Sequence, residues 1–353
     1  RLILSLMLIL GCTVTLLWAV RNGDAIAEEC IPITRAISRG VSFATGILPF
    51  SLIEILLIAA VLGAIAAIIR LIVGLIRKKG RLRRLLSFSS SFLLIALCLI
   101  GLFLAMYGVN YFSRSIDQSL GLDVQERSVE ELEEVTRFMA EQASLNAALT
   151  DRGANLTLTA TDLGQISLMC QTAYDEMAEE NDFFYASGGQ AKGVLNWYLM
   201  SKLGITGIYI PYTAECNVNT DVTAASLPFT VAHEMAHRMG IAPENEANFA
   251  AYLVLRESDN AVLRYSAYYS AFIYCYNALY RVDSQAAYDI MAELSDQVRA
   301  DIQAANERSR KYAGPMRDFG ESVNNAYLQT MQQPSGIQSY GEVVDLIMAD
   351  YFA

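Results

Sequence analysis

The chain carries both of its histidines in one short stretch, Val231-Ala232-His233-Glu234-Met235-Ala236-His237. This is the pattern H-E-x-x-H. Residues four apart lie on one face of an α-helix, so the two imidazoles can bind a single Zn²⁺ ion. Glu234 lies beside the open position of such an ion, where its carboxylate can take a proton from a zinc-activated water. The spacing therefore predicts a helical zinc site with His233 and His237 as ligands and Glu234 as the general base.

A third ligand has to come from another residue type, because the chain has only two histidines. No C-x-x-C spacing supports a cysteine ligand, whereas a carboxylate would complete a two-histidine, one-glutamate site. The nearest acids, Glu244 and Glu246, follow a predicted turn at Gly240. Pro243 suits the first turn of a new helix. Both glutamates are therefore candidates.

The segment Glu244-Asn245-Glu246-Ala247-Asn248 resembles a known zinc-helix signature. Its outer residues resemble the E-x-x-x-D/N signature of the glutamate zincins (gluzincins). It is closer still to the E-x-x-A-D form of membrane-bound prenyl-protein and heat-shock zinc endopeptidases. The resemblance implies that Glu244 binds zinc and that Asn248 holds a zinc-binding histidine by a hydrogen bond. Only six residues separate His237 from Glu244, fewer than in typical gluzincins, so Glu246 remains the alternative ligand.

Hydrophobic residues make up 54% of the 353 residues and charged residues only 18%. Soluble domains have about 25% charged residues, so the composition argues against an ordinary soluble domain. The high apolar content excludes a disordered chain, and six cysteines in 353 residues exclude a disulfide scaffold. The excess of hydrophobic residues lies in residues 1–113, which we interpret as a membrane anchor. Three long apolar runs, at about 2–20, 52–76 and 86–108, predict transmembrane helices. A cleaved signal peptide is the alternative for the first run.

The net charge differs between a basic N-terminal part and an acidic C-terminal part of the chain. Residues 1–108 have a net charge of +7 and residues 109–353 have −18, within a total of −11. The segment Arg77-Lys78-Lys79-Gly80-Arg81-Leu82-Arg83-Arg84 lies between the second and third runs, and the positive-inside rule places it in the cytoplasm. We therefore expect a multi-pass protein of the cell membrane with residues 114–353 as an extracytoplasmic catalytic domain. The acidic balance argues against nucleic-acid binding.

Four cysteines would lie outside the cytoplasm in this topology. Disulfides are permitted there, but small buried apolar residues are the favoured interpretation. The four residues are Cys30, Cys170, Cys216 and Cys275.

Residues 114–353 are predicted to form a mainly α (α+β) domain with a small edge-strand region. Residues 205–218 are β-branched and aromatic and contain Pro211, which predicts one or two short strands at a sheet edge. Ser128 and Glu131 form a capping-box pattern at the first helix. The expected helices cover about 128–149, 161–180, 194–203, 228–239, 244–257, 259–281, 284–309, 317–332 and 340–351.

The order of these features resembles a bacterial family of membrane-anchored proteins known only as a domain of unknown function with a predicted zincin site. Three N-terminal runs precede Gly207–Pro211, Glu215–Asn219 and Leu227–Thr230, and the zinc motifs follow. Tyr327-Leu328 and Ser339-Tyr340-Gly341 come near the end. The resemblance covers essentially the whole chain and implies three transmembrane helices followed by a mainly α, zincin-like metallopeptidase domain.

These features together predict a membrane-anchored zinc metallopeptidase that hydrolyses a peptide or protein substrate. An intramembrane protease is disfavoured, because residues 222–240 are too polar for a span. The alternative from another class is a non-catalytic zinc-binding or ligand-sensing membrane protein on a zincin fold.

Overall fold

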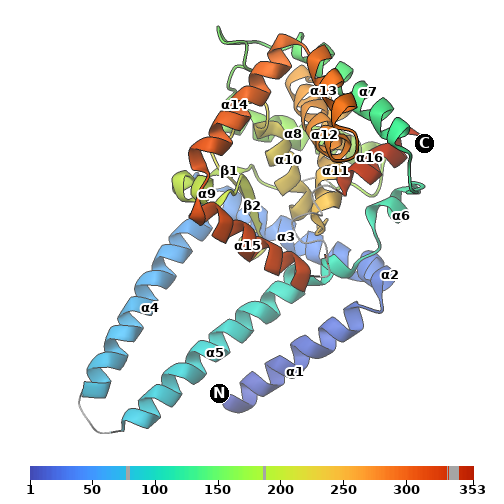
Figure 1. Ribbon diagram of the computed structural model, residues 1–353. Coiled ribbons are helices and arrows are strands. Elements are labelled where there is room, and N and C mark those ends of the chain that lie inside the picture. The colour runs from blue at the N-terminus through green and yellow to red at the C-terminus, as the bar shows by residue number, and fades with distance from the viewer. Residues whose placement is uncertain (77–79, 186–187, 332, 334–341) are drawn as a thin grey trace.

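Three long apolar helices extend from one end of a folded domain (Figure 1). The computed structural model describes residues 1–76, 80–185, 188–331, 333 and 342–353. Within these residues, α1 (Leu2–Ala19), α4 (Leu52–Ile76) and α5 (Arg81–Met106) are the helices long and apolar enough to cross a membrane. They match the three predicted runs, except that α5 begins five residues earlier because its first turn carries the arginines.

All three apolar helices meet the folded domain at one end (Figure 1). The C-terminal ends of α1 and α5 and the N-terminal end of α4 lie next to the domain, and the opposite ends point away from it. Arg81, Arg83 and Arg84 therefore lie at the end of α5 that is far from the domain. This arrangement is compatible with the predicted topology, in which the basic loop and the domain lie on opposite sides of the membrane.

The segment between α1 and α4 contains a helix that the sequence analysis did not predict. Short α2 (Gly23–Ala25) and a π-helical turn (Ile26–Cys30) lead into α3 (Ile31–Gly46), with Pro32 in its first turn. Four hydroxyl residues repeat along one face of α3, and all four are buried against the domain: Thr34, Ser38, Ser42 and Thr45. The helix was missed because its buried face is polar, the reverse of the usual signal.

The folded domain is mainly helical, as predicted. Side-chain caps fix several helix starts, including the Ser128–Glu131 capping box of α7, Asp162 before α8 and Asn260 before α12. After a 3₁₀ turn (Gly108–Phe112), the helices are α6 (Ile116–Leu120), α7 (Val129–Ala147), α8 (Leu163–Glu180), α9 (Trp197–Leu203), α10 (Leu227–Arg238), α11 (Glu244–Arg256), α12 (Ala261–Val282), α13 (Ser284–Glu293), α14 (Asp296–Tyr312), α15 (Pro315–Thr330) and α16 (Val343–Tyr351).

The single helix predicted over 284–309 is wrong. Helix α13 ends at Glu293, and a new helix, α14, begins at Asp296. The Ser295 hydroxyl caps α14 by accepting a hydrogen bond from the Val298 amide. Leu294 is buried in the break. Serine favours a helix N-cap over a helix interior, and this local signal outweighs the continuous helical pattern. The predicted start of the last helix, Tyr340, lies outside the described residues.

The predicted strands form a small sheet. Within the described part of the chain, β1 (Lys192–Gly193), β3 (Glu215–Val218) and β2 (Gly207–Ile210) lie in that order. The pair β2 and β3 is antiparallel, with Tyr209 opposite Cys216, and β1 runs parallel to β3. Strand β2 is therefore an edge strand, as Pro211 predicted, whereas β1 was not anticipated.

Helix α10 lies at the centre of the core, between α8, α11, α12 and the sheet. Tyr174 on α8 donates a hydrogen bond to the carbonyl of Ala232 (2.8 Å), and Cys216 on β3 lies 3.2 Å from the carbonyl of Glu234. All six cysteines are free. Cys170, Cys216 and Cys275 are buried, and burial raises the pKa of each thiol, so they serve as small core residues.

Candidate metal centre

A tight turn brings the start of α11 back onto the end of α10. Gly240 has φ +94°, a left-handed conformation that glycine adopts without strain. The Ile241 amide donates to the carbonyl of Ala236 (3.2 Å), and Pro243 then caps α11, whose first residue is Glu244. A side chain at Gly240 would also crowd Asn110, 3.1 Å away. The predicted turn is thus present and sets Glu244 near the two histidines.

His233, His237 and Glu244 form a cluster that can hold a metal ion. Each offers one donor atom, and the three donors lie within 4.8 Å of one another. Oε2 of Glu244 lies 3.1 Å from Nε2 of His233 and 3.5 Å from Nε2 of His237. Among the described residues, no other group of three or more such side chains comes this close. The structure therefore brings together the first-choice ligand set from the sequence.

The contacts of His237 determine which ring nitrogen is free. Nδ1 of His237 lies 2.8 Å from the carbonyl oxygen of Ile241 and 2.8 Å from the hydroxyl of Tyr107. A carbonyl only accepts hydrogen bonds, so Nδ1 carries the proton and donates it. With Nδ1 engaged in this way, Nε2 is the nitrogen that faces Glu244, and it would bind a metal on release of its own proton.

The charges of the cluster are strongly coupled. Burial alone would lower the pKa of His237, but the Glu244 carboxylate outweighs it and raises that pKa to about 9. Burial alone would raise the pKa of Glu244, but His237 and His233 hold it well below its usual range. Oε2 of Glu244 is buried and makes no hydrogen bond of acceptable geometry. A buried carboxylate oxygen that faces two imidazole nitrogens is suited to a shared cation.

Glu234 lies next to this cluster and is enclosed by strand β2. Its carboxylate lies against the backbone of Tyr209, and a Cβ on Gly207 would come within 2.8 Å of its Cδ. Glycine at 207 therefore leaves the space that this carboxylate occupies. Burial raises the pKa of Glu234 to about 7, against the opposing effect of both histidines. The other carboxylate oxygen, Oε2, is buried without a hydrogen-bond partner.

Glu246 points away from the cluster. Its carboxylate lies against the backbone of Ile116, near Asp117, and burial raises its pKa to about 8. Residues two apart on a helix do not share a face, so Glu244 and Glu246 cannot both turn toward the histidines. The geometry favours Glu244 over the alternative Glu246.

Asn248 is buried. In the described part of the chain it makes no hydrogen bond to His233 or His237. Its Nδ2 has no partner, and neither does Nδ1 of His233. The role implied for Asn248 by the resemblance stays a prediction. Tyr107 and Ile241 are the residues that hold His237, and neither is predicted by the motif. Tyr107 precedes His237 by 130 residues, so no local pattern could pair them.

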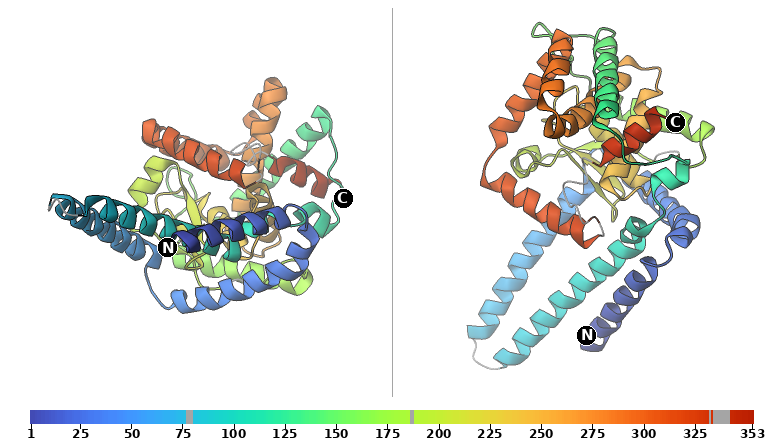
Figure 2. Two further views of the ribbon diagram at one scale, coloured as in Figure 1. Left: turned by 90° about the horizontal axis from the view of Figure 1, so that it is seen from below. Right: turned by 45° about the vertical axis from the view of Figure 1, so that its right-hand side comes forward.

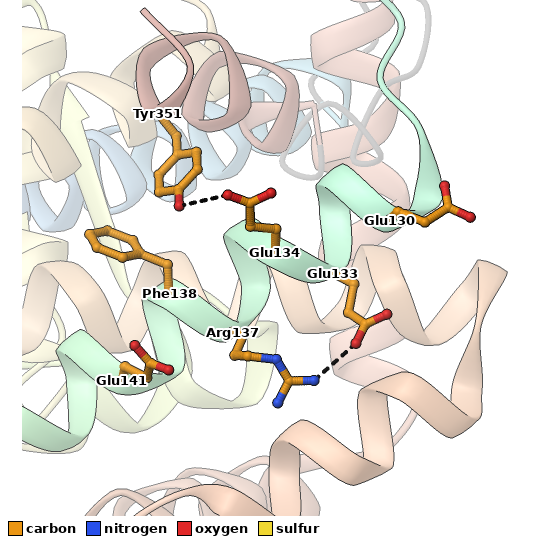
Figure 3. A pocket seen from close by; sticks show the side chains of 7 residues that line it. All are labelled: Glu130, Glu133, Glu134, Arg137, Phe138, Glu141 and Tyr351. Carbon is orange, nitrogen blue, oxygen red and sulfur yellow. Dashed lines mark hydrogen bonds and ion pairs between the residues drawn. The ribbon is translucent and has the colours of Figure 1, made fainter.

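Among the described residues there is also a surface pocket of about 370 Å³, lined by residues that are distant in sequence from the metal cluster (Figure 3). It lies along α7 and beside α16, and Tyr351 donates a hydrogen bond to Glu134 there. None of its lining residues belongs to the metal cluster: Glu130, Glu133, Glu134, Arg137, Phe138, Glu141 and Tyr351. A group of partly exposed acids is ordinary helix surface, so we assign the pocket no function.

Over residues 32–348 the chain matches the family described as "Protein of unknown function (DUF3810)", and it belongs to that family. The match spans α4, α5 and the whole metal cluster. No curated protein and no solved structure matches the chain. Membership in a family of unknown function with apolar N-terminal helices is thus confirmed, whereas the zincin-like fold and the metallopeptidase activity stay predictions.

Proposed function

We propose that this member of the DUF3810 family is a membrane-anchored zinc metallopeptidase. The observation that carries the proposal is the convergence of His233, His237 and Glu244 on one point, with the Glu234 carboxylate beside it. Two imidazole nitrogens and a carboxylate oxygen are the ligand set of many catalytic zinc sites. Three protein ligands leave the fourth position of a tetrahedral ion for water or substrate.

Zinc bound there would supply a Lewis acid that lowers the pKa of a water molecule and polarises a peptide carbonyl. Glu234 would accept the proton of that water on its carboxylate. It would then deliver the proton to the amine nitrogen that leaves as the peptide bond breaks. Burial raises the pKa of Glu234, and a carboxylate whose pKa is raised toward neutrality is suited to both accepting and donating a proton.

Strand β2 would position the substrate. It is an edge strand whose Tyr209 amide contacts Glu234, so an extended peptide paired with β2 would pass beside the catalytic carboxylate. Tyr107 and Ile241 would hold the His237 ring in its metal-binding orientation.

The membrane part of the proposal follows from α1, α4 and α5. We propose that they span the cell membrane and that the domain lies outside the cytoplasm. The exposed apolar surface of these helices supports the first statement. The arginines at the distal end of α5 support the second.

A test compares Glu234→Gln with wild type, using the full chain reconstituted in liposomes and a library of unstructured peptides. We expect the variant to keep about one zinc per chain while the cleavage rate falls about 10²–10⁴-fold. Glu179→Gln, an exposed position on α8, is the matched control and should retain activity. A Glu234→Gln variant that cleaves like wild type would exclude this mechanism.

The non-catalytic alternative predicts a different result. A zinc-binding sensor needs the three ligands but no buried base, so the buried Glu234 carboxylate, whose Oε2 has no hydrogen-bond partner, favours the peptidase. If the wild-type chain binds zinc but cleaves no peptide in the library, the sensor becomes the better description.

A further inference from the structure

We propose that α3 and α15 lie in the membrane interface with their outward faces in lipid, so that the domain is seated on the bilayer as well as anchored in it. This contact rests on the membrane anchor proposed above, but it requires neither zinc nor peptidase activity.

Helix α3 has the polarity of a helix whose outer surroundings are apolar. Its hydroxyl residues, including Ser38 and Ser42, are almost fully buried against the domain. The opposite face carries Ile33, Phe43 and Ile47, which are 61%, 76% and 76% exposed. A surface helix in water turns its apolar stripe inward and its polar face outward. The reversed pattern of α3 fits a helix between protein and lipid.

Hydrogen bonds fix α3 in this orientation. Ser38 Oγ lies 3.0 Å from the Tyr209 hydroxyl and donates to the carbonyl of Arg238 (3.2 Å). Thr45 Oγ1 donates to the carbonyl of Thr213 (3.0 Å). Rotating the helix to bury its apolar face would break these bonds and leave buried partners unsatisfied.

The chain connections hold α3 at the level where the spans meet the domain. Residues 20–30 join α1 to α3, and residues 47–51 join α3 to α4. Both neighbouring helices are proposed spans, so both ends of α3 are tied to the membrane surface. The helix contains no acidic residue, and its exposed Arg39 carries a charge that complements anionic headgroups, whereas Arg35 donates to carbonyls of the domain.

Helix α15 presents a second apolar row. Phe319, Val323 and Tyr327 are spaced four apart and so share one side of the helix. Phe319 and Val323 are 65% and 53% exposed, whereas Tyr327 packs on Phe103 of α5 with ring centroids 6.3 Å apart. The exposed row therefore continues directly from the surface of a proposed span.

The two helices lie on opposite sides of the three spans when the domain is seen from below (Figure 2, left). A single protein partner would have to reach around the spans to cover both faces. The bilayer surrounds the spans on every side and covers both faces at once. Lipid is therefore the occupant that the arrangement favours over a second copy of the chain.

Tryptophan quenching by lipids brominated on their acyl chains tests this contact in the full chain. The chain has two tryptophans, Trp18 and Trp197. In a Trp18→Phe, Trp197→Phe background reconstituted in liposomes, we would introduce Phe43→Trp or Phe319→Trp. Both reporters are expected to be quenched to an extent comparable with Trp18 and to show blue-shifted emission. Each is an aromatic exchange at an exposed position, which limits its effect on folding.

Two controls bracket the result. Tyr288→Trp in the same background is a matched aromatic exchange on α13, 53% exposed and far from the spans, and should not be quenched. The single variant Trp197→Phe keeps Trp18 in α1 and reports insertion of the anchor. If Trp18 is quenched while Phe43→Trp and Phe319→Trp behave like Tyr288→Trp, the interface contact is wrong and the anchor stands. Quenching of only one reporter overturns the contact for the other helix, and an unquenched Trp18 overturns the anchor itself.

Discussion

The hydroxyl of Tyr107 lies 2.8 Å from Nδ1 of His237. Tyr107 directly follows the last residue of α5, and His237 is one of the three candidate metal ligands. One hydrogen bond therefore joins the end of an apolar helix to the metal cluster. A displacement of that helix end would therefore shift the position of His237, a candidate metal ligand, through this hydrogen bond.

The first prediction concerns this hydrogen bond. We expect Tyr107→Phe to weaken zinc binding by about tenfold, because groups that orient a ligating histidine contribute about 10–100-fold to affinity and the Ile241 carbonyl remains in place. Competition with a zinc chelator measures the change. Tyr111→Phe is the matched control, since its hydroxyl bonds Tyr327 and not a histidine. Equal affinities for the two variants would contradict the assigned role of Tyr107.

The second prediction separates the two candidate carboxylate ligands. We expect Glu244→Gln to lose most of the zinc that the purified wild-type chain holds, because its Oε2 faces both histidine Nε2 atoms. Glu246→Gln should keep about one ion per chain, because its carboxylate is engaged by Ile116. Metal analysis of both purified variants decides the matter. The reverse outcome would make Glu246 the ligand.

The third prediction concerns the space reserved for the general base. Gly207→Ala would set a methyl group 2.8 Å from Cδ of Glu234, so the carboxylate must move. We expect the cleavage rate to fall about 10²-fold while zinc content is unchanged, since a displacement of about 1 Å at a catalytic group has that effect. Gly40→Ala, where an added Cβ meets nothing within 4 Å, is the control. Full activity of Gly207→Ala would show that Glu234 does not have to stay where it lies.

The fourth prediction concerns stability at the junction of α4 and the sheet. Glu215 accepts hydrogen bonds from the amides of Leu52 and Ile53 at the start of α4, and pairs with buried Lys192 at 2.7 Å. We expect Glu215→Ala to destabilise the chain by about 3–5 kcal/mol, because it leaves an unpaired buried ammonium.

Thermal unfolding in detergent measures this loss. Glu293→Ala, which removes a partly exposed partner of Arg137, should cost less than about 1 kcal/mol. Similar unfolding temperatures for Glu215→Ala and Glu293→Ala would show that the Glu215 contacts do not hold α4 to the domain.

The sequence by itself determined the features that depend on local periodicity. A spacing of four residues places His233 and His237 on one helix face whatever surrounds them. The length and apolarity of the three N-terminal runs likewise fix three helices of spanning length. Ser295 is an equally local N-cap signal, but it lies inside a continuous helical pattern, and that pattern by itself predicts one helix across the break.

The tertiary structure decided what depends on residues far apart in the chain. The choice between Glu244 and Glu246 depends on how the turn at Gly240 sets α11 against α10, and the sequence left both open. The contact between Tyr107 and His237 and the fit of Glu234 beside Gly207 arise from packing across 130 and 27 residues. The reversed polarity of α3 is visible only once the domain covers its hydroxyl face, because burial is a property of the assembled fold and not of the helix.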